Sequence, residues 1–245
     1  MMKITIHGPK GGTVLGMREK KNRKYWQIAL APLVPLVVIG GYFWPYLGYI
    51  AILMLLFMLI LAVFRGRYYC GWFCAMGSFH ERVISLVSRK KKMLPVFKAQ
   101  WFRWTVFTMM MGLLTSRLVL SGGDSEKIGA TFVMMWSIAT GLAIGIGLIW
   151  KPRSWCSICP MGMLQGLIGL RAYRLQIGDG CSECGLCEKV CPIETNPGNM
   201  RSIGIVKSVD CMRCGNCVVN CPAKALSFAG QSQASCVTVE TSAEK

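Results

Sequence analysis

Long apolar runs, separated by polar or basic segments, dominate about the first 150 residues of the chain. The runs cover approximately residues 26–44, 46–64, 101–120 and 128–150. A helix that crosses a bilayer needs about 20 such residues. The pattern therefore predicts an all-α membrane domain of four helices within residues 26–174, with a kink at Pro32 and Pro35 in the first helix.

The third apolar run is interrupted by charge. Arg103 and Arg117 leave 13 uncharged residues between them, so we expect at least one of the two side chains to snorkel towards the membrane surface. Four spans place residues 1–25, 65–100 and 151–245 on the same side of the membrane, whereas three spans would separate them. Four spans are therefore the consistent prediction.

The net charge of +17 lies in alternate connections between the apolar runs. Residues 1–24, 65–103 and 151–174 carry +6, +8 and +4, whereas residues 115–128 carry no net charge and residues 175–245 carry −1. The positive-inside rule assigns such basic connections to the cytoplasm. We therefore expect a bacterial inner (cytoplasmic) membrane protein with both termini in the cytoplasm. No nucleic-acid-binding motif accompanies the charge, so we expect no nucleic-acid partner.

Two copies of the motif Cys-x2-Cys-x2-Cys-x3-Cys-Pro follow the apolar region and end at Pro192 and Pro222. This is the spacing of bacterial ferredoxins with two [4Fe–4S] clusters, in which the fourth cysteine of each motif binds the other cluster. Two four-cysteine zinc sites are the alternative, but zinc sites usually use two cysteine pairs rather than a triplet with a distal Cys-Pro. The predicted ligands are Cys181, Cys184, Cys187 and Cys221 for one cluster, and Cys211, Cys214, Cys217 and Cys191 for the other.

These patterns divide the chain into four parts. Residues 1–25 form a cytoplasmic N-terminal segment, residues 26–174 the membrane domain and residues 175–228 a small α+β ferredoxin module. Residues 229–245 read as a disordered tail, in which Cys236 has no partner in any motif. Because thiolates must stay reduced to hold clusters, we expect the cysteine-rich end to face the cytoplasm.

Two further cysteine pairs lie where the second and fourth apolar runs end. They are Cys70 with Cys74 and Cys156 with Cys159, and each precedes an amphipathic stretch, 78–87 or 163–173. The arrangement is an internal repeat, and parallel repeats related by an axis along the membrane normal would bring the two pairs together. Three interpretations stay open: a third iron–sulfur centre, redox-active dithiols, or structural turns whose cysteines bind nothing.

The combination of four spans, paired Cys-x2/3-Cys motifs and a two-cluster ferredoxin end resembles the polyferredoxin-like membrane iron–sulfur proteins. These include the membrane quinol dehydrogenase subunit of periplasmic nitrate reductase systems, the methylamine-utilisation membrane ferredoxin and the membrane regulators of nitrous-oxide reductase. The resemblance covers residues 25–228 and departs at Ala75, where the pattern usually has proline. It implies electron transfer between the membrane quinone pool and a partner oxidoreductase, in an undetermined direction.

Few other residues suggest chemistry. His80 and Glu81 follow Cys74 at the predicted membrane edge and are candidate acceptors for quinol protons. The predicted spans contain no histidine, which a membrane haem would need as an axial ligand, so we expect no haem. Two alternatives to a quinone-linked subunit stay open: a regulatory protein that supplies electrons for metal-centre assembly or senses redox state, and a scaffold that docks a redox complex.

Overall fold

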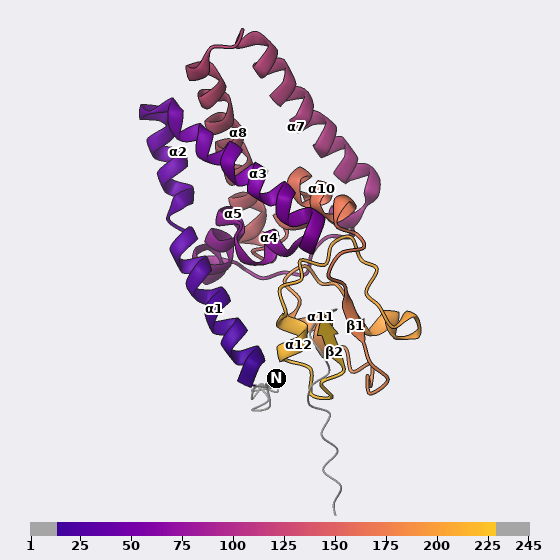
Figure 1. Ribbon diagram of the computed structural model, residues 1–245. Helices are drawn as coiled ribbons and strands as arrows, with labels where there is room; N and C mark the ends of the chain where they lie inside the picture. The colour runs from indigo at the N-terminus through magenta and orange to yellow at the C-terminus, as the bar shows by residue number, and fades with distance from the viewer. Residues whose placement is uncertain (1–13, 229–245) are drawn as a thin grey trace, which may run out of the picture.

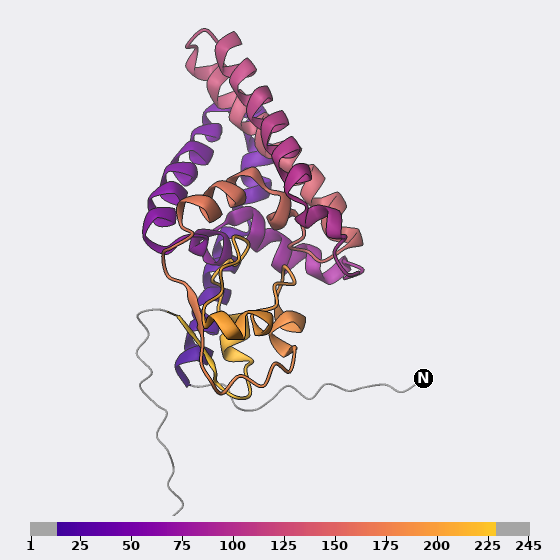
Figure 2. The same cartoon turned by 90° about the vertical axis from the view of Figure 1, so that its right-hand side faces the viewer.

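The computed structural model describes residues 14–228 of the chain. Apolar helices occupy one end of the molecule and a small cysteine-rich module occupies the other, with several short helices between them (Figures 1 and 2). The predicted tail at 229–245, with Cys236, lies outside the described residues. The same is true of residues 1–13 of the predicted N-terminal segment.

The first apolar run forms two helices rather than one kinked helix. α1 (Val14–Leu30) ends just before Pro32, and α2 (Leu33–Phe43) follows it. Proline has no backbone N–H and clashes with the preceding turn, so the predicted kink is a short break. After η1 (Pro45–Leu47), the chain returns as α3 (Gly48–Arg65).

The second helical hairpin consists of α7 (Gln100–Leu120) and α8 (Ser125–Ile149), which meet at the end of the molecule away from the module (Figures 1 and 2). Asp124 caps α8 by accepting a hydrogen bond from the backbone N–H of Glu126 at 3.1 Å. The α8 helix packs against both α2 and α3. The two hairpins therefore form one helical body.

Within residues 14–228, three segments are long and apolar enough to cross a membrane: Lys21–Phe43, Pro45–Arg65 and Ser125–Ile149. The α7 helix has 21 residues, a length of about 31 Å, but its charged and hydroxylated residues keep it out of this group. Arg103 does not snorkel. It is buried and donates hydrogen bonds to the Phe97 carbonyl at 3.2 Å and to Asp210 at 2.7 Å.

The apolar helices present large hydrophobic side chains on their outer surface. Leu36 of α2, and Leu53 and Ile60 of α3, are 54%, 67% and 59% exposed. A continuous apolar surface of this kind needs a covering, and lipid is the covering that matches its chemistry. The apolar helices are therefore suited to lie in a membrane.

Short helices connect the apolar helices to the module. The first repeat contributes α4 (Tyr68–Trp72), α5 (Ala75–Phe79), the π-helical turn η2 (His80–Ile84) and α6 (Ser85–Val87), and η3 (Pro95–Lys98) precedes α7. The second repeat contributes α9 (Trp155–Ile158) and α10 (Pro160–Ile168). The α10 helix starts three residues before the predicted helix at 163–173, because Pro160 takes its first helical position.

The cysteine-rich module is closed by a two-stranded antiparallel sheet. β1 (Leu175–Ile177) pairs with β2 (Leu226–Phe228), with Leu175 opposite Phe228. The inward side chains of both strands and Val206 form the module's small hydrophobic core. Between the strands lie α11 (Leu186–Val190), η4 (Gly198–Ile203) and α12 (Asn216–Val219).

Candidate metal centres

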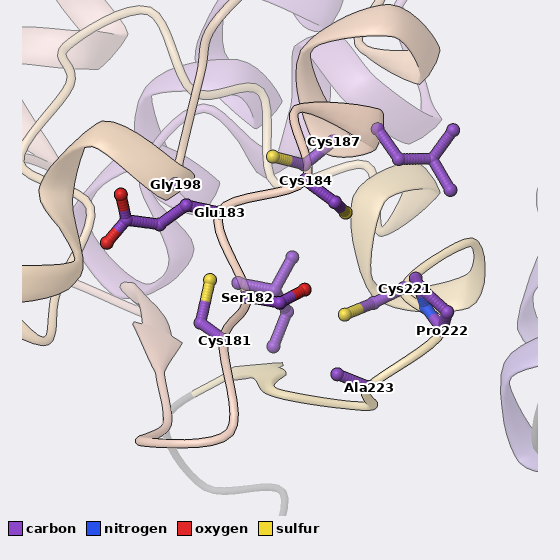
Figure 3. A pocket seen from close by; sticks show the side chains of 11 residues that line it. Cys181, Ser182, Glu183, Cys184, Cys187, Gly198, Cys221, Pro222 and Ala223 are labelled. Carbon is purple, nitrogen blue, oxygen red and sulfur yellow. The ribbon is translucent and has the colours of Figure 1, made fainter.

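The first hollow in the module is lined by Cys181, Cys184, Cys187 and Cys221. Figure 3 shows their side chains around the space that they share. Three of these cysteines come from the first motif and Cys221 comes from the second. Cys184 is exposed to solvent, whereas the other three are partly buried.

A second hollow is lined by the remaining four motif cysteines, Cys191, Cys211, Cys214 and Cys217. Here Cys191 is the member that comes from the first motif. Cys187 lines both hollows, so the two are neighbours. The structure thus gathers the same two sets of four cysteines that the motif spacing predicts, exchanging one cysteine between the motifs.

The two motifs repeat the same unusual backbone conformation. Gly185 and Gly215, which precede α11 and α12, have φ of 70° and 75°. Glu183 and Arg213, two positions earlier, have φ of 52° and 51°. Left-handed residues at matched places turn the backbone tightly around each hollow, which points amide groups towards sulfur atoms.

The cysteine environment fits an iron–sulfur cluster. Burial raises the pKa of Cys211 to about 11 and that of Cys217 well above its ordinary value, so positive charge must enter the hollow before these thiols ionise. The Thr195 N–H donates to Cys191 Sγ at 3.3 Å, as amides do around cluster sulfurs. Among residues 14–228, no three ligand-type side chains lie close enough to hold a single metal ion. The triplet with a distal cysteine in each motif disfavours zinc and suits a cube with one cysteine on each iron.

The second cysteine set lies between the apolar helices and the module, on two turns of similar construction. Cys74 is the N-cap of α5 and accepts a hydrogen bond from the Gly77 N–H at 3.4 Å. Cys159 is the N-cap of α10, three residues before Gly162. The unequal spacing is absorbed by Phe73, which separates α4 from Cys74, whereas Cys159 follows α9 directly.

Cysteines from both pairs lie close enough to influence one another. Burial, and then Cys70 and Cys156, raises the pKa of the Cys74 thiol. Burial, and then Cys70, raises the pKa of Cys159 to about 11. Cys70 itself is buried and donates to Gln165 Oε1 of the second repeat at 2.8 Å. The two repeats therefore bring their cysteines into one shared site, which we call the inter-repeat site.

Two buried arginines cross between the repeats. Arg67, in the first repeat, donates to the Cys156 carbonyl of the second at 2.6 Å. Arg153, in the second repeat, donates to the Cys70 carbonyl of the first at 2.6 Å. Only 1% of Arg67 and 2% of Arg153 is exposed, so both charges lie in the interior. Each guanidinium thus ties its own repeat to the cysteine turn of the other.

Each crossing arginine shares a carboxylate with a second buried arginine. Asp210 pairs with Arg67 at 3.3 Å and with Arg103 at 2.7 Å. Glu81 likewise pairs with Arg153 and with Arg23. These carboxylates satisfy charges that would be very costly to bury alone.

Glu81 is fully engaged by positive groups. Its carboxylate lies 2.6 Å from Arg153 and 2.7 Å from Arg23, and it also accepts from Gln27 at 3.0 Å. Burial alone would raise the pKa of Glu81, but Arg153 and Arg23 lower it below its ordinary value. This environment favours a permanent counter-ion over a group that takes up protons.

His80 has a different environment. It is 2% exposed, and its Nδ1 lies 2.8 Å from the Met76 carbonyl. Burial lowers the pKa of His80, so the imidazole is neutral near pH 7. Within residues 14–228 no hydrogen bond joins it to Glu81. The two predicted proton acceptors are therefore adjacent in sequence but have different hydrogen-bond partners.

The inter-repeat site touches the second hollow. Cys70 packs with Ile193 and Met212 in one buried cluster, against which Cys156 and Cys191 also pack. Met212 and Ile193 line the second hollow as well. The three cysteine groups consequently form a continuous series from the apolar helices to the exposed Cys184.

Sequence reasoning missed the arginines of the inter-repeat site. Among the side chains that the structure describes, five arginines are buried (Arg23, Arg67, Arg103, Arg153 and Arg213), whereas the charge pattern by itself indicates only topology. Arg67 and Arg153 each stand three residues before the first cysteine of a pair, a repeat that could have indicated their role. Arg23 and Asp210 carry no comparable local signal.

Comparisons with known proteins match this arrangement. A family model described as a 4Fe–4S binding domain matches residues 47–93 and 132–177, the two repeats that contain the paired cysteines. The chain is 26% identical to the ferredoxin-type protein NapH of Haemophilus influenzae over 70% of its length and 65% of the relative's. It is 26% identical to the methylamine utilization ferredoxin-type protein MauN of Methylorubrum extorquens over 58% of its length and 52% of the relative's.

An uncharacterized protein of Methanocaldococcus jannaschii is also 26% identical, over 69% of this chain and 67% of its own. The chain thus spans about half to two thirds of the length of these relatives. No solved structure matches the chain significantly.

Fold, cysteine sites and relatives together define a membrane iron–sulfur protein of the ferredoxin type, with a role in electron transfer. The chain resembles the polyferredoxin-like membrane iron–sulfur proteins, as the sequence pattern predicts.

Proposed function

We propose that this protein is a membrane electron-transfer subunit that connects the quinone pool with a partner oxidoreductase. The observation that carries the proposal is the continuous series of cysteine groups from the base of the apolar helices to the exposed end of the module. Bound [4Fe–4S] clusters supply one-electron oxidation and reduction. The residues described above hold and space these centres.

Cys181, Cys184, Cys187 and Cys221 hold one cluster in this proposal, and Cys191, Cys211, Cys214 and Cys217 hold the other. Cys187 lines both hollows, so neighbouring centres share a protein wall. Because Cys184 is exposed, the first hollow is the end at which a partner protein can approach. The redox partner therefore docks on the module.

The inter-repeat site holds a third iron–sulfur centre through Cys70, Cys74, Cys156 and Cys159. Its four cysteines come from two repeats that both match a 4Fe–4S binding description. Met212 and Ile193 separate this site from the second hollow, so the third centre lies between the membrane helices and the module. A redox-inert turn would not need one buried and three partly buried cysteines beside two buried guanidinium groups.

Quinone reacts beside the inter-repeat site in this proposal, and His80 is the proton acceptor. A quinol that loses two electrons also loses two protons; in this proposal a base takes the first and solvent takes the second. His80 offers a neutral, buried imidazole, whereas the Glu81 carboxylate is occupied by arginines. We therefore assign the proton acceptor role to His80 and a counter-ion role to Glu81.

The membrane arrangement is also part of the proposal. We infer four spans, in which α7 is added to the three apolar segments, because α7 forms a hairpin with α8 (Figure 1). An even number of spans keeps the basic connections on one side of the membrane. The termini and the module then lie in the cytoplasm of a cell whose inner membrane holds the helices. Cysteine labelling from the two sides of the membrane, with single cysteines introduced at Ser121 and at Lys98, tests this topology.

The decisive experiment follows the clusters directly. The full chain, purified anaerobically in detergent, is mixed with menaquinol or ubiquinol while EPR monitors cluster reduction, and the dithionite-reduced protein is mixed with the oxidised quinones. We expect the clusters to change redox state with one quinone at least. If no quinone changes any cluster signal, the quinone link is wrong and the regulatory alternative gains support.

Iron analysis tests the third centre separately. Wild-type protein should contain about 12 iron atoms, and a variant with serine at Cys70, Cys74, Cys156 and Cys159 should contain about 8. Cys236→Ser is the matched control, since that cysteine belongs to none of the motifs. Equal iron content in wild type and the four-serine variant would show that no third centre exists.

A further inference from the structure

The inter-repeat site contains more positive charge than its own carboxylates can neutralise. Four buried guanidinium groups, Arg23, Arg67, Arg103 and Arg153, surround two carboxylates, Glu81 and Asp210. Two positive charges are therefore left in excess in the protein interior. An interior excess of charge is strongly unfavourable unless an ion of opposite sign accompanies it.

The excess lies against the cysteine turns. Arg67 and Arg153 donate to the carbonyl groups of Cys156 and Cys70, both at 2.6 Å. The glycine three residues after each second cysteine makes room for them. A Cβ at Gly162 would clash with the Arg67 guanidinium, and a Cβ at Gly77 with that of Arg153.

We propose that Arg67 and Arg153 are positioning residues that clamp the two cysteine turns together across the repeats and make the inter-repeat site selective for an anionic centre. A cube held by four thiolates is such a centre, and its negative charge increases by one on reduction. The inference rests on the third centre of the proposed function and adds how the protein builds and tunes it.

Two physical consequences follow from the clamp. First, the arginine charges stabilise the reduced, more negative state of the centre and so raise its reduction potential. Second, each guanidinium contacts a carboxylate through one terminal nitrogen and donates to a backbone carbonyl through the other. A lysine ammonium reproduces this geometry poorly. Charge therefore controls the potential, and the planar fork controls assembly of the site.

The test is an EPR-monitored redox titration of the full-length protein, with iron and sulfide analysis. Arg67→Gln and Arg153→Gln should each shift the oxidised-to-reduced ratio of the third centre at a fixed potential by at least tenfold towards the oxidised form. For a one-electron couple this shift is a decrease of about 59 mV. The signals of the two clusters in the module serve as an internal control and should keep their intensity.

Arg117→Gln is the matched control, because it removes the same charge from an exposed position in α7. Arg117 lies about 21 Å along the helix from Arg103, and we expect wild-type potential and iron content. Arg67→Lys and Arg153→Lys keep the charge without the fork. They should keep the potential of the third centre but lower its iron occupancy. They test the clamp if a glutamine variant does not fold.

The outcomes separate the clamp from the third centre itself. Lower potential or lost third-centre iron in both glutamine variants supports the clamp. Wild-type potential and iron in those variants, while the four-serine variant lacks four iron atoms, overturns the clamp and leaves the third centre intact. An effect of only one of the two arginines overturns the reciprocal arrangement. Unchanged iron in the four-serine variant removes the third centre, which is a failure of the proposed function.

Discussion

The two repeats present the same parts in the same order but differ in the residues between them. Arg67, Cys70, Cys74 and Gly77 of the first repeat correspond to Arg153, Cys156, Cys159 and Gly162 of the second. The shared residues are those that face the opposite repeat through hydrogen bonds or close packing. The differences include Glu81 and Gln165, which also contact the opposite repeat, so the two sides of the crossing are not equivalent.

Three differences are informative. His80 of the first repeat corresponds to Gln165 of the second, and Gln165 accepts from Cys70 whereas His80 points to the Met76 carbonyl. Arg153 of the second repeat pairs with Glu81 of the first, whereas Arg67 of the first repeat pairs with Asp210 from the module. Ala75 stands where the second repeat has Pro160. Each difference yields a test.

The two carboxylates should differ in their contribution to stability. Glu81→Gln leaves two buried arginines without a counter-ion, so we expect a loss of about 3–5 kcal/mol in the free energy of unfolding. Asp210→Asn should lower the free energy of unfolding by roughly half as much, because the contact between Asp210 and Arg67 is longer, at 3.3 Å. Unfolding with SDS in mixed micelles measures both.

Glu183→Gln is the control for this comparison. Glu183 forms an exposed ion pair with Arg201 at 3.6 Å, and such pairs contribute little. We expect no measurable change in its unfolding curve. Wild-type stability of Glu81→Gln would contradict the view that its carboxylate neutralises buried arginines.

The crossing glycines should both resist substitution. Gly77→Ala and Gly162→Ala place a methyl group against the guanidinium of the opposite repeat, and overpacking of this kind costs about 1–3 kcal/mol. Gly141→Ala is the control, since a Cβ there meets nothing within 4 Å, and it should stabilise α8 by up to about 1 kcal/mol. A loss in only one of the two glycine variants would show that the repeats do not cross symmetrically.

His80 should make the first repeat sensitive to acid. Burial lowers the pKa of His80 in the folded protein below its ordinary value of 6.5, so the unfolded chain binds the proton first. Stability is then lost as the pH falls below about 6.5, with a slope of up to about 1.4 kcal/mol per pH unit. Glu81, whose pKa is also lowered, adds a loss only below about 4.5.

His80→Gln copies the second repeat and should remove this slope between pH 6.5 and 5. The measurement is the SDS unfolding midpoint at each pH, with iron content followed in parallel. A slope that persists in His80→Gln would assign the acid sensitivity to another group.

The sequence predicts some parts of this architecture well because their signals are local. The spacing within 41 residues, 181–221, is enough to indicate which cysteines share each hollow, including the exchange of Cys191 and Cys221. Apolar runs likewise locate the helices, because an uninterrupted run of about 20 apolar residues is typical of a membrane-crossing helix. The apolar runs do not fix the number of spans in the same way, because α7 is only moderately apolar. Three segments in the described part of the chain are long and apolar enough to cross a membrane.

The arginine clamp could not be derived in the same way. Arg67 lies 143 residues from Asp210, and Arg23 lies 193 residues from Asn216, to which it donates. Contacts over such separations depend on how the hairpins and the module dock, which no local pattern encodes. In the sequence, a buried arginine and a topology-determining arginine look identical.

The smallest expected effect concerns Ala75, the departure from the family pattern. Ala75→Pro should change the free energy of unfolding by less than about 1 kcal/mol, and in the stabilising direction, since proline reduces the freedom of the unfolded chain. Ala75 occupies the first position of α5, where a helix does not use the backbone N–H. The preceding residue, Cys74, already has φ −65° and ψ 113°, a conformation that proline requires of its neighbour and that closely matches Cys159 at φ −53° and ψ 123°. Third-centre iron content and the SDS midpoint measure the result; a loss of iron would mean that Ala75 itself, rather than its helix position, is needed by the site.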